Sequence, residues 1–171
     1  MSSAISQSLL PEFDHEMATA RRVLERVPED RAEFRPHPKS MTLARLAGHV
    51  SEIPLWAVMT LREHELDVNP PGGAPMTAAT MTTRATLLAS FDALVAQARA
   101  LLADTGDAAM METWTLKSGG QAILAMPRVA VLRSFVMNHL IHHRAQLAVY
   151  LRMNDVPVPS IYGPSADEGS M

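Results

Sequence analysis

The sequence predicts an all-α fold, a single four-helix bundle. Four segments of about 20 residues repeat apolar residues every three or four positions, which is the period of an amphipathic helix. The segments are separated by connections that contain proline and glycine. The chain has 171 residues, of which 47% are hydrophobic and 19% charged, and this favours one domain over residues 1–171. Helices with one apolar stripe bury it most simply in a four-helix bundle.

The first two helices are expected over residues 5–27 and 42–65. The first ends before Pro28, which cannot continue a helix, and the second begins at Thr42, a residue whose side chain can cap a helix. Their inward stripes are expected to consist of Leu10, Phe13, Met17, Ala20, Leu24 and Val27 in the first and Leu43, Leu46, Val50, Ile53 and Ala57 in the second.

The third and fourth helices are expected over residues 82–104 and 128–154. Pro127 suits the first turn of the last helix, because a helix leaves its first N–H groups unpaired. Between them, residues 111–126 contain two β-prone runs on either side of a Ser-Gly-Gly sequence at 118–120. This pattern predicts a small hairpin or an irregular excursion before the last long helix.

Composition excludes several functions. The net charge is −3 with no basic run, so nucleic-acid binding is not expected. Because there is no cysteine, any metal must bind nitrogen or oxygen ligands. The start of the chain lacks a signal-peptide pattern, and no apolar run approaches the roughly 20 residues that span a bilayer. A cytoplasmic protein without membrane association is expected.

His139 and His143 are the most informative residues. They lie four positions apart, so an α-helix projects both imidazoles from one face. The same stripe continues through apolar residues, so both histidines occupy inward positions. A buried imidazole with an unmet hydrogen bond costs about 1–3 kcal/mol, and one shared cation would satisfy a nitrogen of each. The pair therefore favours a metal site, although this spacing alone is weak evidence.

A third ligand must come from another helix, and His49 is the best candidate. It lies in the middle of the second helix beside the inward residues Leu46 and Ile53. The alternative is a histidine at the border of the core. Glu52 follows three residues later and is a candidate catalytic residue that orients an imidazole, accepts a proton or supplies an oxygen ligand. Its alternative is an exposed helical glutamate.

The remaining candidates carry less weight. A swap of ligands would allow His142 to replace its neighbour, but a surface position is favoured because it points about 100° away. The other histidines read as surface residues: His15, His37 and His64. Three aromatic residues are candidate pocket walls, with ordinary packing as the alternative: Trp56, Trp114 and Tyr162.

The sequence resembles the DinB-like family, whose members are regarded as metalloenzymes. The resemblance is carried by the Asn-His-Leu-Ile-His-His-Arg-Ala-Gln-Leu stretch at 138–147, by the following segment at 150–168, and by Thr-Leu-Ala-Arg-Leu-Ala-Gly-His at 42–49. It implies a four-helix bundle with up-down-down-up connectivity. It also implies a metal triad formed by His49, His139 and His143.

The resemblance further implies one divalent metal ion, with zinc, nickel, iron and manganese all acceptable to three imidazoles. The expected function is to activate water or a low-molecular-weight thiol for attack on an electrophilic small molecule, as a thiol S-transferase or a hydrolase. Since the chain has no cysteine, such a thiol must be a cosubstrate. A homodimer is also expected. The alternative is a non-catalytic metal-binding or structural dimeric bundle in a stress response, and whether the chain is an enzyme stays open.

Overall fold

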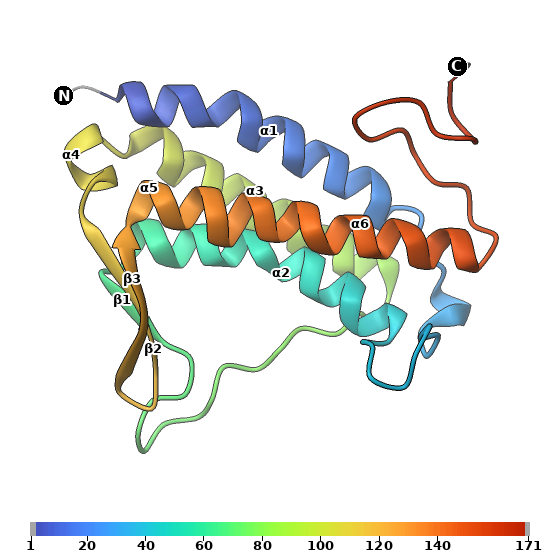
Figure 1. Cartoon of the computed structure of the whole chain (residues 1–171), viewed down its shortest axis with the longest axis horizontal. Coiled ribbons are helices and arrows are strands. Elements are labelled where there is room, and N and C mark those ends of the chain that lie inside the picture. The colour runs from blue at the N-terminus through green and yellow to red at the C-terminus, as the bar shows by residue number, and fades with distance from the viewer. Residues whose placement is uncertain (1–2, 170–171) are drawn as a thin grey trace.

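The computed structural model describes residues 3–169 and is mostly helical with one small sheet. Four long helical segments lie side by side, and the sheet lies at one end of them (Figure 1). The long segments are α1 (Ala4–Leu24), α2 (Leu43–Arg62), α3 (Arg84–Asp104), and a last one that runs through α5 (Arg128–Val131), a π-helical turn η2 (Leu132–Met137) and α6 (Asn138–Met153). Two short helices complete the helical part: η1 (Glu29–Arg31) and α4 (Asp107–Met110).

The directions of the helices follow from contacts at their ends. Just before α3, the Met81 N–H donates to the carbonyl of Ala44 at the start of α2, so these two helices begin at the same end. At the other end, the Asp107 carboxylate accepts from the N–H of Ile5 in the first turn of α1. A long loop after α2 makes the parallel arrangement possible, and it runs along the outside of the helices in Figure 1.

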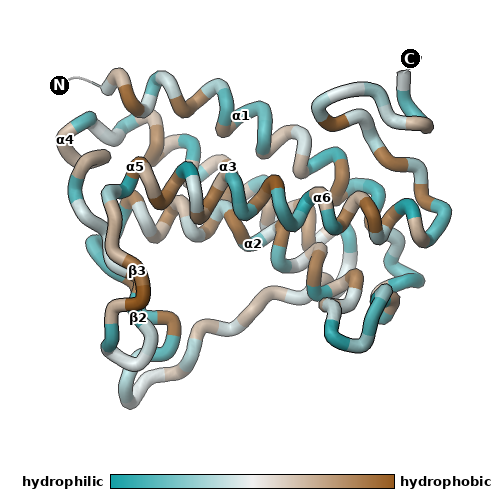
Figure 2. Tube along the Cα trace, viewed as in Figure 1, coloured by the Kyte–Doolittle hydropathy of each residue, from teal (hydrophilic) through white to brown (hydrophobic). Residues whose placement is uncertain are grey.

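The core lies between the long helices, as their apolar stripes predicted. Hydrophobic residues recur in short stretches along each helix (Figure 2). Burying one such side chain contributes about 1.5–3 kcal/mol, so the stripes dominate the stability of the bundle. Large side chains that are almost fully buried include Met17, Leu24, Leu46, Ile53, Phe91, Leu140 and Leu147.

The chain is mostly helical as expected, but a third strand, which was not expected, joins the hairpin to form a three-stranded sheet. The helix expected to reach residue 65 ends at Arg62, since Glu63 is extended with φ −107° and ψ 164°. The chain then forms β1 (Glu65–Asp67), which pairs in parallel with β2 (Thr113–Ser118). The local sequence up to residue 65 predicts the end of a helix. Residues 65–67 form a strand instead because β2 supplies partners for their backbone hydrogen bonds.

The hairpin expected at 111–126 is present. Strand β2 pairs antiparallel with β3 (Gln121–Pro127). Gly119 and Gly120 form the turn with φ of 64° and 79°, a conformation that glycine adopts without a steric penalty. Trp114 on β2 is fully buried and packs in a small second core beneath the sheet.

The last helical segment is continuous but not uniformly α-helical. The residues at the junctions of α5, η2 and α6 all keep right-handed helical backbone angles. The π turn ends at Met137, two residues before His139. A π turn inserts an extra residue and so rotates the residues that follow relative to those before, and such turns occur frequently at functional sites.

Helix α3 is, by length and composition alone, long and apolar enough to cross a membrane. It packs against α1 and α2 in the bundle, and Leu87, Phe91, Ala98 and Leu102 are buried there. The expectation that no segment reaches this threshold was therefore too strict.

Candidate metal centre

Three imidazoles from two helices meet at one point. His49 lies on α2, and His139 and His143 lie one turn apart on α6. The Nε2 atoms of His49 and His139 are 3.1 Å apart, and the ring centroids of His49 and His143 are 4.4 Å apart. One ligand nitrogen from each ring lies within 4.8 Å of the other two. The three residues therefore form a cluster that could hold a metal ion.

The outer nitrogens of two of these rings have polar partners. The Nδ1 atom of His49 is 2.7 Å from Oε1 of Glu52, and Nδ1 of His143 is 2.8 Å from Oε1 of Gln146. Both partners lie three residues after their histidine, so one helical turn supplies each contact. Such partners fix the tautomer and the orientation of an imidazole, and leave Nε2 with its lone pair free.

His139 differs from the other two. Its Nδ1 atom is buried without a hydrogen-bond partner among the described residues, although the nearby backbone of Phe135 partly opposes the lowering of its pKa. The ring is instead held by packing: its centroid lies 5.6 Å from that of the Phe135 ring. The orientation of His139 therefore depends on the π turn that carries Phe135.

Burial keeps two of the imidazoles uncharged at neutral pH. It lowers the pKa of His143 from 6.5 to about 4, against a smaller opposing effect of the hydrogen bond with Gln146. Burial also lowers the pKa of His139, and the charge of a protonated His49 would lower it further. Neutral imidazoles are the form that binds metal ions, so these two rings need no deprotonation before they bind one.

Glu52 connects His49 to the loop after α2. Its Oε2 atom accepts a hydrogen bond of 2.6 Å from the backbone N–H of Ala79, and Arg45 approaches Oε1 at 3.4 Å. Burial alone would raise the pKa of Glu52, but the hydrogen bonds from His49 and Ala79 and the charge of Arg45 lower it on balance. Glu52 is therefore an anion at neutral pH with both oxygens engaged.

The cluster fits a divalent metal ion. Zinc–nitrogen bonds of about 2.0–2.1 Å in a tetrahedron place two ligand nitrogens roughly 3.3 Å apart, close to the 3.1 Å between His49 and His139. Three neutral nitrogens leave the charge of the ion uncompensated and at least one coordination position open. Catalytic sites have this arrangement, whereas structural sites are closed by four protein ligands.

A cavity of about 260 Å³ lies beside the cluster, with His49 and Glu52 in its lining. Its apolar wall includes Trp56, whose ring packs edge-on against Phe135 with 5.2 Å between centroids. The loop after α2 also lines the cavity, through residues 76–78. A small molecule in this cavity would therefore touch His49, the one histidine of the cluster in its lining.

Gly48 allows this loop to lie against α2. A Cβ atom at this position would come within 2.5 Å of the carbonyl oxygen of Ala79 and 2.8 Å of Cα of Thr80. Both are backbone atoms, so no side-chain rotation would relieve the clash. The absence of a side chain next to His49 is thus a requirement of the loop that covers the site.

The other histidines and two of the aromatic candidates lie outside the cluster. His142 is exposed, and its ring lies edge-on to that of His143, with 4.8 Å between centroids. Tyr162 lies in the C-terminal tail, where its hydroxyl contacts Arg144 and Glu16, and Trp114 lies under the sheet. The surface histidines are exposed as expected: His15, His37 and His64.

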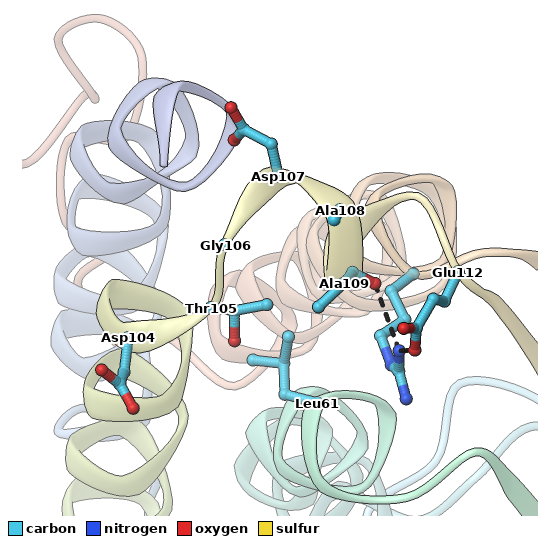
Figure 3. Close-up of a pocket in the computed structure, with 9 residues that line it drawn as sticks. Leu61, Asp104, Thr105, Gly106, Asp107, Ala108, Ala109 and Glu112 are labelled. Carbon is cyan, nitrogen blue, oxygen red and sulfur yellow. Dashed lines mark hydrogen bonds and ion pairs between the residues drawn. The ribbon is translucent and has the colours of Figure 1, made fainter. Parts of the chain in front are cut away.

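A larger cavity of about 680 Å³ involves none of these residues. It lies where α3 meets α4, beside Asp104, Asp107 and Glu112 (Figure 3). Its one arginine, Arg128, donates to the carbonyls of Thr60, Ala109 and Glu63 and pairs with Glu112. Because the guanidinium of Arg128 is already hydrogen-bonded and ion-paired within the protein, it is not free to bind a ligand in this cavity.

The fold and the site define a helical-bundle protein with a three-histidine cluster between two of its helices. A family profile described as the DinB superfamily matches residues 12–147. The chain therefore belongs to the DinB superfamily, as the resemblance indicated. No curated protein of known function matches the chain.

Two solved structures share the fold. A DinB-like protein from Bacillus cereus ATCC 10987 is 20% identical with a TM-score of 0.69, and the match covers 91% of this chain and 97% of that one. A DinB-like protein from Bacillus subtilis is 18% identical with a TM-score of 0.64, and the match covers 88% and 96%. At these identities the likeness concerns the fold alone.

Sequence reasoning missed two residues of the site. Gln146 had a detectable signal, because it follows His143 at the same three-residue offset that relates Glu52 to His49. Arg45 lies one turn before His49 and lines the cavity. Its role had no such signal, since arginines near the start of an amphipathic helix are usually exposed.

Proposed function

We propose that the chain binds one divalent metal ion through His49, His139 and His143, and that the ion activates a water or a low-molecular-weight thiol. The activated group would attack an electrophilic small molecule in the adjacent cavity. The observation that carries the proposal is the convergence of three ligand nitrogens within 4.8 Å of one another. Membership of the DinB superfamily supports it, and we include in it the up-down-down-up helix order and the homodimer that the resemblance implies.

The residues around the cluster have distinct tasks in this mechanism. Glu52 and Gln146 hold the Nδ1 atoms of His49 and His143, so both Nε2 atoms face the cluster. A bound divalent ion would lower the pKa of a coordinated water or thiol toward neutrality. We assign Glu52 a positioning role in place of a proton-accepting one, because both of its oxygens already accept hydrogen bonds.

The cavity wall contributes by excluding water. Trp56, Val68 and Met76 form an apolar surface beside His49. An electrophile packed on this surface would meet the activated group with few competing water molecules. The thiol route requires a thiol from solution, since the chain contains no cysteine.

Metal analysis of tag-free protein tests the first part of the proposal. We expect close to one divalent ion per chain in the wild type and much less than one in His143→Ala. His142→Ala is the matched control, because it removes the neighbouring exposed imidazole and should leave the metal content unchanged. Equal metal content in wild type and His143→Ala would refute the proposed site.

Turnover assays test the second part. Metal-loaded protein is incubated with a panel of low-molecular-weight thiols and either a halogenated aromatic or an epoxide, and thiol consumption is followed. A parallel arm without thiol measures hydrolysis of an activated ester. We expect a rate that is lost in His49→Ala and kept in His142→Ala. Stoichiometric metal without any turnover would favour the non-catalytic metal-binding alternative.

A further inference from the structure

The cavity beside the histidine cluster combines an apolar wall with one arginine. Trp56, Val68, Met76 and Ala78 provide apolar lining, and Arg45 lies among the same lining residues. An arginine that only served the surface would extend into solvent, but the side chain of Arg45 is 26% exposed. Arg45 is therefore a partly buried member of the cavity lining.

The hydrogen bonds of Arg45 leave one edge of the guanidinium free. A single nitrogen, NH1, makes both contacts with the protein: it donates to the carbonyl of Ala79 at 2.9 Å and approaches Glu52 at 3.4 Å. Within residues 3–169, neither Nε nor NH2 of Arg45 has a hydrogen-bond partner. The Nε–NH2 edge is a planar pair of donors that matches the two oxygens of a carboxylate.

The ion pair between Glu52 and Arg45 is weak and leaves Arg45 able to bind a second anion. Its two oxygens already accept hydrogen bonds from His49 at 2.7 Å and from the Ala79 N–H at 2.6 Å. The longer contact with Arg45, at 3.4 Å, is the weakest of the three. Arg45 therefore keeps both its free edge and attraction for a second anion.

The positions of Arg45, His49 and Trp56 on α2 indicate what kind of ligand the cavity would fit. Arg45 and His49 lie one turn apart on the same face, and the Arg45 side chain extends along the helix, so that NH1 and the Nδ1 atom of His49 both contact Oε1 of Glu52. Trp56 lies about two turns beyond His49 on the same face. A ligand along this face would meet the cation and His49 side by side at one end and the aromatic ring of Trp56 at the other.

We propose that Arg45 is a specificity-determining residue that selects small carboxylates with an apolar body. The carboxylate accepts two hydrogen bonds from Nε and NH2 of Arg45, and the apolar body packs against Trp56 and Met76. The atoms between them lie beside His49. The cavity of about 260 Å³ is below the roughly 300–1,000 Å³ of drug-sized pockets, which favours a small ligand. Reading this ligand as the substrate rests on the proposed function, whereas its binding does not need a metal.

Calorimetric titration of metal-free protein with two matched probes tests this inference. The probes are 3-phenylpropanoate and 3-phenylpropan-1-ol, which share the apolar body and differ in the charged end. Chelator-treated protein is used so that a carboxylate cannot bind through a metal ion. The variants are Arg45→Gln, Arg45→Lys and the control Arg99→Gln, whose arginine pairs with Asp14 on the surface.

We expect wild type and Arg99→Gln to prefer the carboxylate by about tenfold or more, as a charge-assisted bidentate pair would provide. Arg45→Gln should abolish the preference. Arg45→Lys keeps the charge but lacks the planar pair of donors, so it should lose most of the preference, and it decides the question if the glutamine variant does not fold. Circular dichroism checks folding.

Three results would overturn the inference: equal affinity of wild type for both probes, no detectable binding of the carboxylate, or an unchanged preference in the Arg45 variants. Metal analysis on the same preparations reports on the proposed metal site separately. Failure of that site with carboxylate preference intact would leave Arg45 as an anion-binding residue of a cavity without metal chemistry.

Discussion

Glu52 follows His49 by one turn of α2, and its Oε1 atom lies 2.7 Å from the Nδ1 atom of His49 while its Oε2 atom accepts the Ala79 N–H. One carboxylate thus joins an imidazole of the cluster to the loop that walls the cavity. This relationship makes Glu52 the residue through which the loop and the candidate metal centre depend on each other.

Replacing Glu52 by glutamine should weaken metal binding. The amide keeps the size of the side chain but removes the negative charge that fixes His49, and loss of such a partner typically costs about 10–100-fold in metal affinity. Competition with a fluorescent chelator measures the change. Glu33→Gln is the control, because Glu33 is exposed and makes no hydrogen bond within the described chain. Unchanged affinity in Glu52→Gln would show that His49 needs no such support.

Gly48→Ala should destabilise the protein by about 1–3 kcal/mol, the usual cost of forcing an extra methyl group into a packed contact. The new Cβ would meet the backbone of Ala79 and Thr80, so the loop must move away from α2. Urea denaturation measures the free energy of unfolding. Gly163→Ala is the control, because a Cβ there meets nothing within 4 Å. Equal stability of both variants would contradict the close packing of the loop.

The stability of metal-free protein should rise with pH between about 4 and 6.5. Burial lowers the pKa of His143 from 6.5 to about 4, so in this window the unfolded chain binds more protons than the folded one. His143 therefore costs no stability above about 6.5 and penalises folding progressively as the pH falls toward 4. His139 acts in the same direction.

Urea titrations at several pH values measure this dependence. His143→Gln keeps a polar side chain without a titrating group, so its stability should change less steeply across the same window. His142→Gln, at the neighbouring exposed position, should follow the wild type. A His143→Gln profile as steep as that of the wild type would show that the His143 imidazole is not desolvated.

Arg144→Met should destabilise the protein by about 3–5 kcal/mol, as expected when one partner of a buried ion pair is removed. The side chains of Arg144 and Glu16 are 1% and 6% exposed, and their charged atoms are 2.7 Å apart. The same arginine donates to the hydroxyl of Tyr162 at 2.7 Å and so ties the C-terminal tail to the bundle. Thermal and urea denaturation both measure the loss.

Arg99→Met provides the comparison for this prediction. Arg99 pairs with Asp14 across two helices, but both side chains are largely exposed, at 51% and 42%. Exposed pairs contribute about 0–1 kcal/mol, so this variant should be close to the wild type. If both substitutions lower the free energy of unfolding by the same amount, the buried pair of Arg144 and Glu16 contributes no more to stability than the exposed pair, and it does not hold the C-terminal tail in place.

Local sequence patterns identified much of the fold and the candidate site. The apolar period located the four long helices to within a few residues, and the hairpin before the last helix was recognised from two β-prone runs around glycines. Within α6, the four-residue spacing placed His139 and His143 on one face. The link to His49 came from its place beside the core and from the family resemblance. Each of these inferences depends on nearby residues or on a motif.

The features that local sequence patterns did not predict arise from contacts between residues far apart in the sequence. Strand β1 forms because β2, about 50 positions later, offers it a parallel partner. Arg45 and Glu52 acquire their roles because Ala79, in the loop, supplies a carbonyl to one and an N–H to the other. Neither the β1–β2 pairing nor the hydrogen bonds of Ala79 produce a periodic pattern in the sequence from which they could be predicted.

The amino-acid sequence by itself determined which residues face inward and which of them carry imidazole nitrogens, because helix periodicity is a local property of the chain. Only the tertiary structure decided that His49 meets the pair on α6, that residues 76–78 of the loop line the cavity beside His49, and that Arg45 lies in the lining of the same cavity. These outcomes depend on the packing of helices far apart in sequence, and packing is set by the whole core at once.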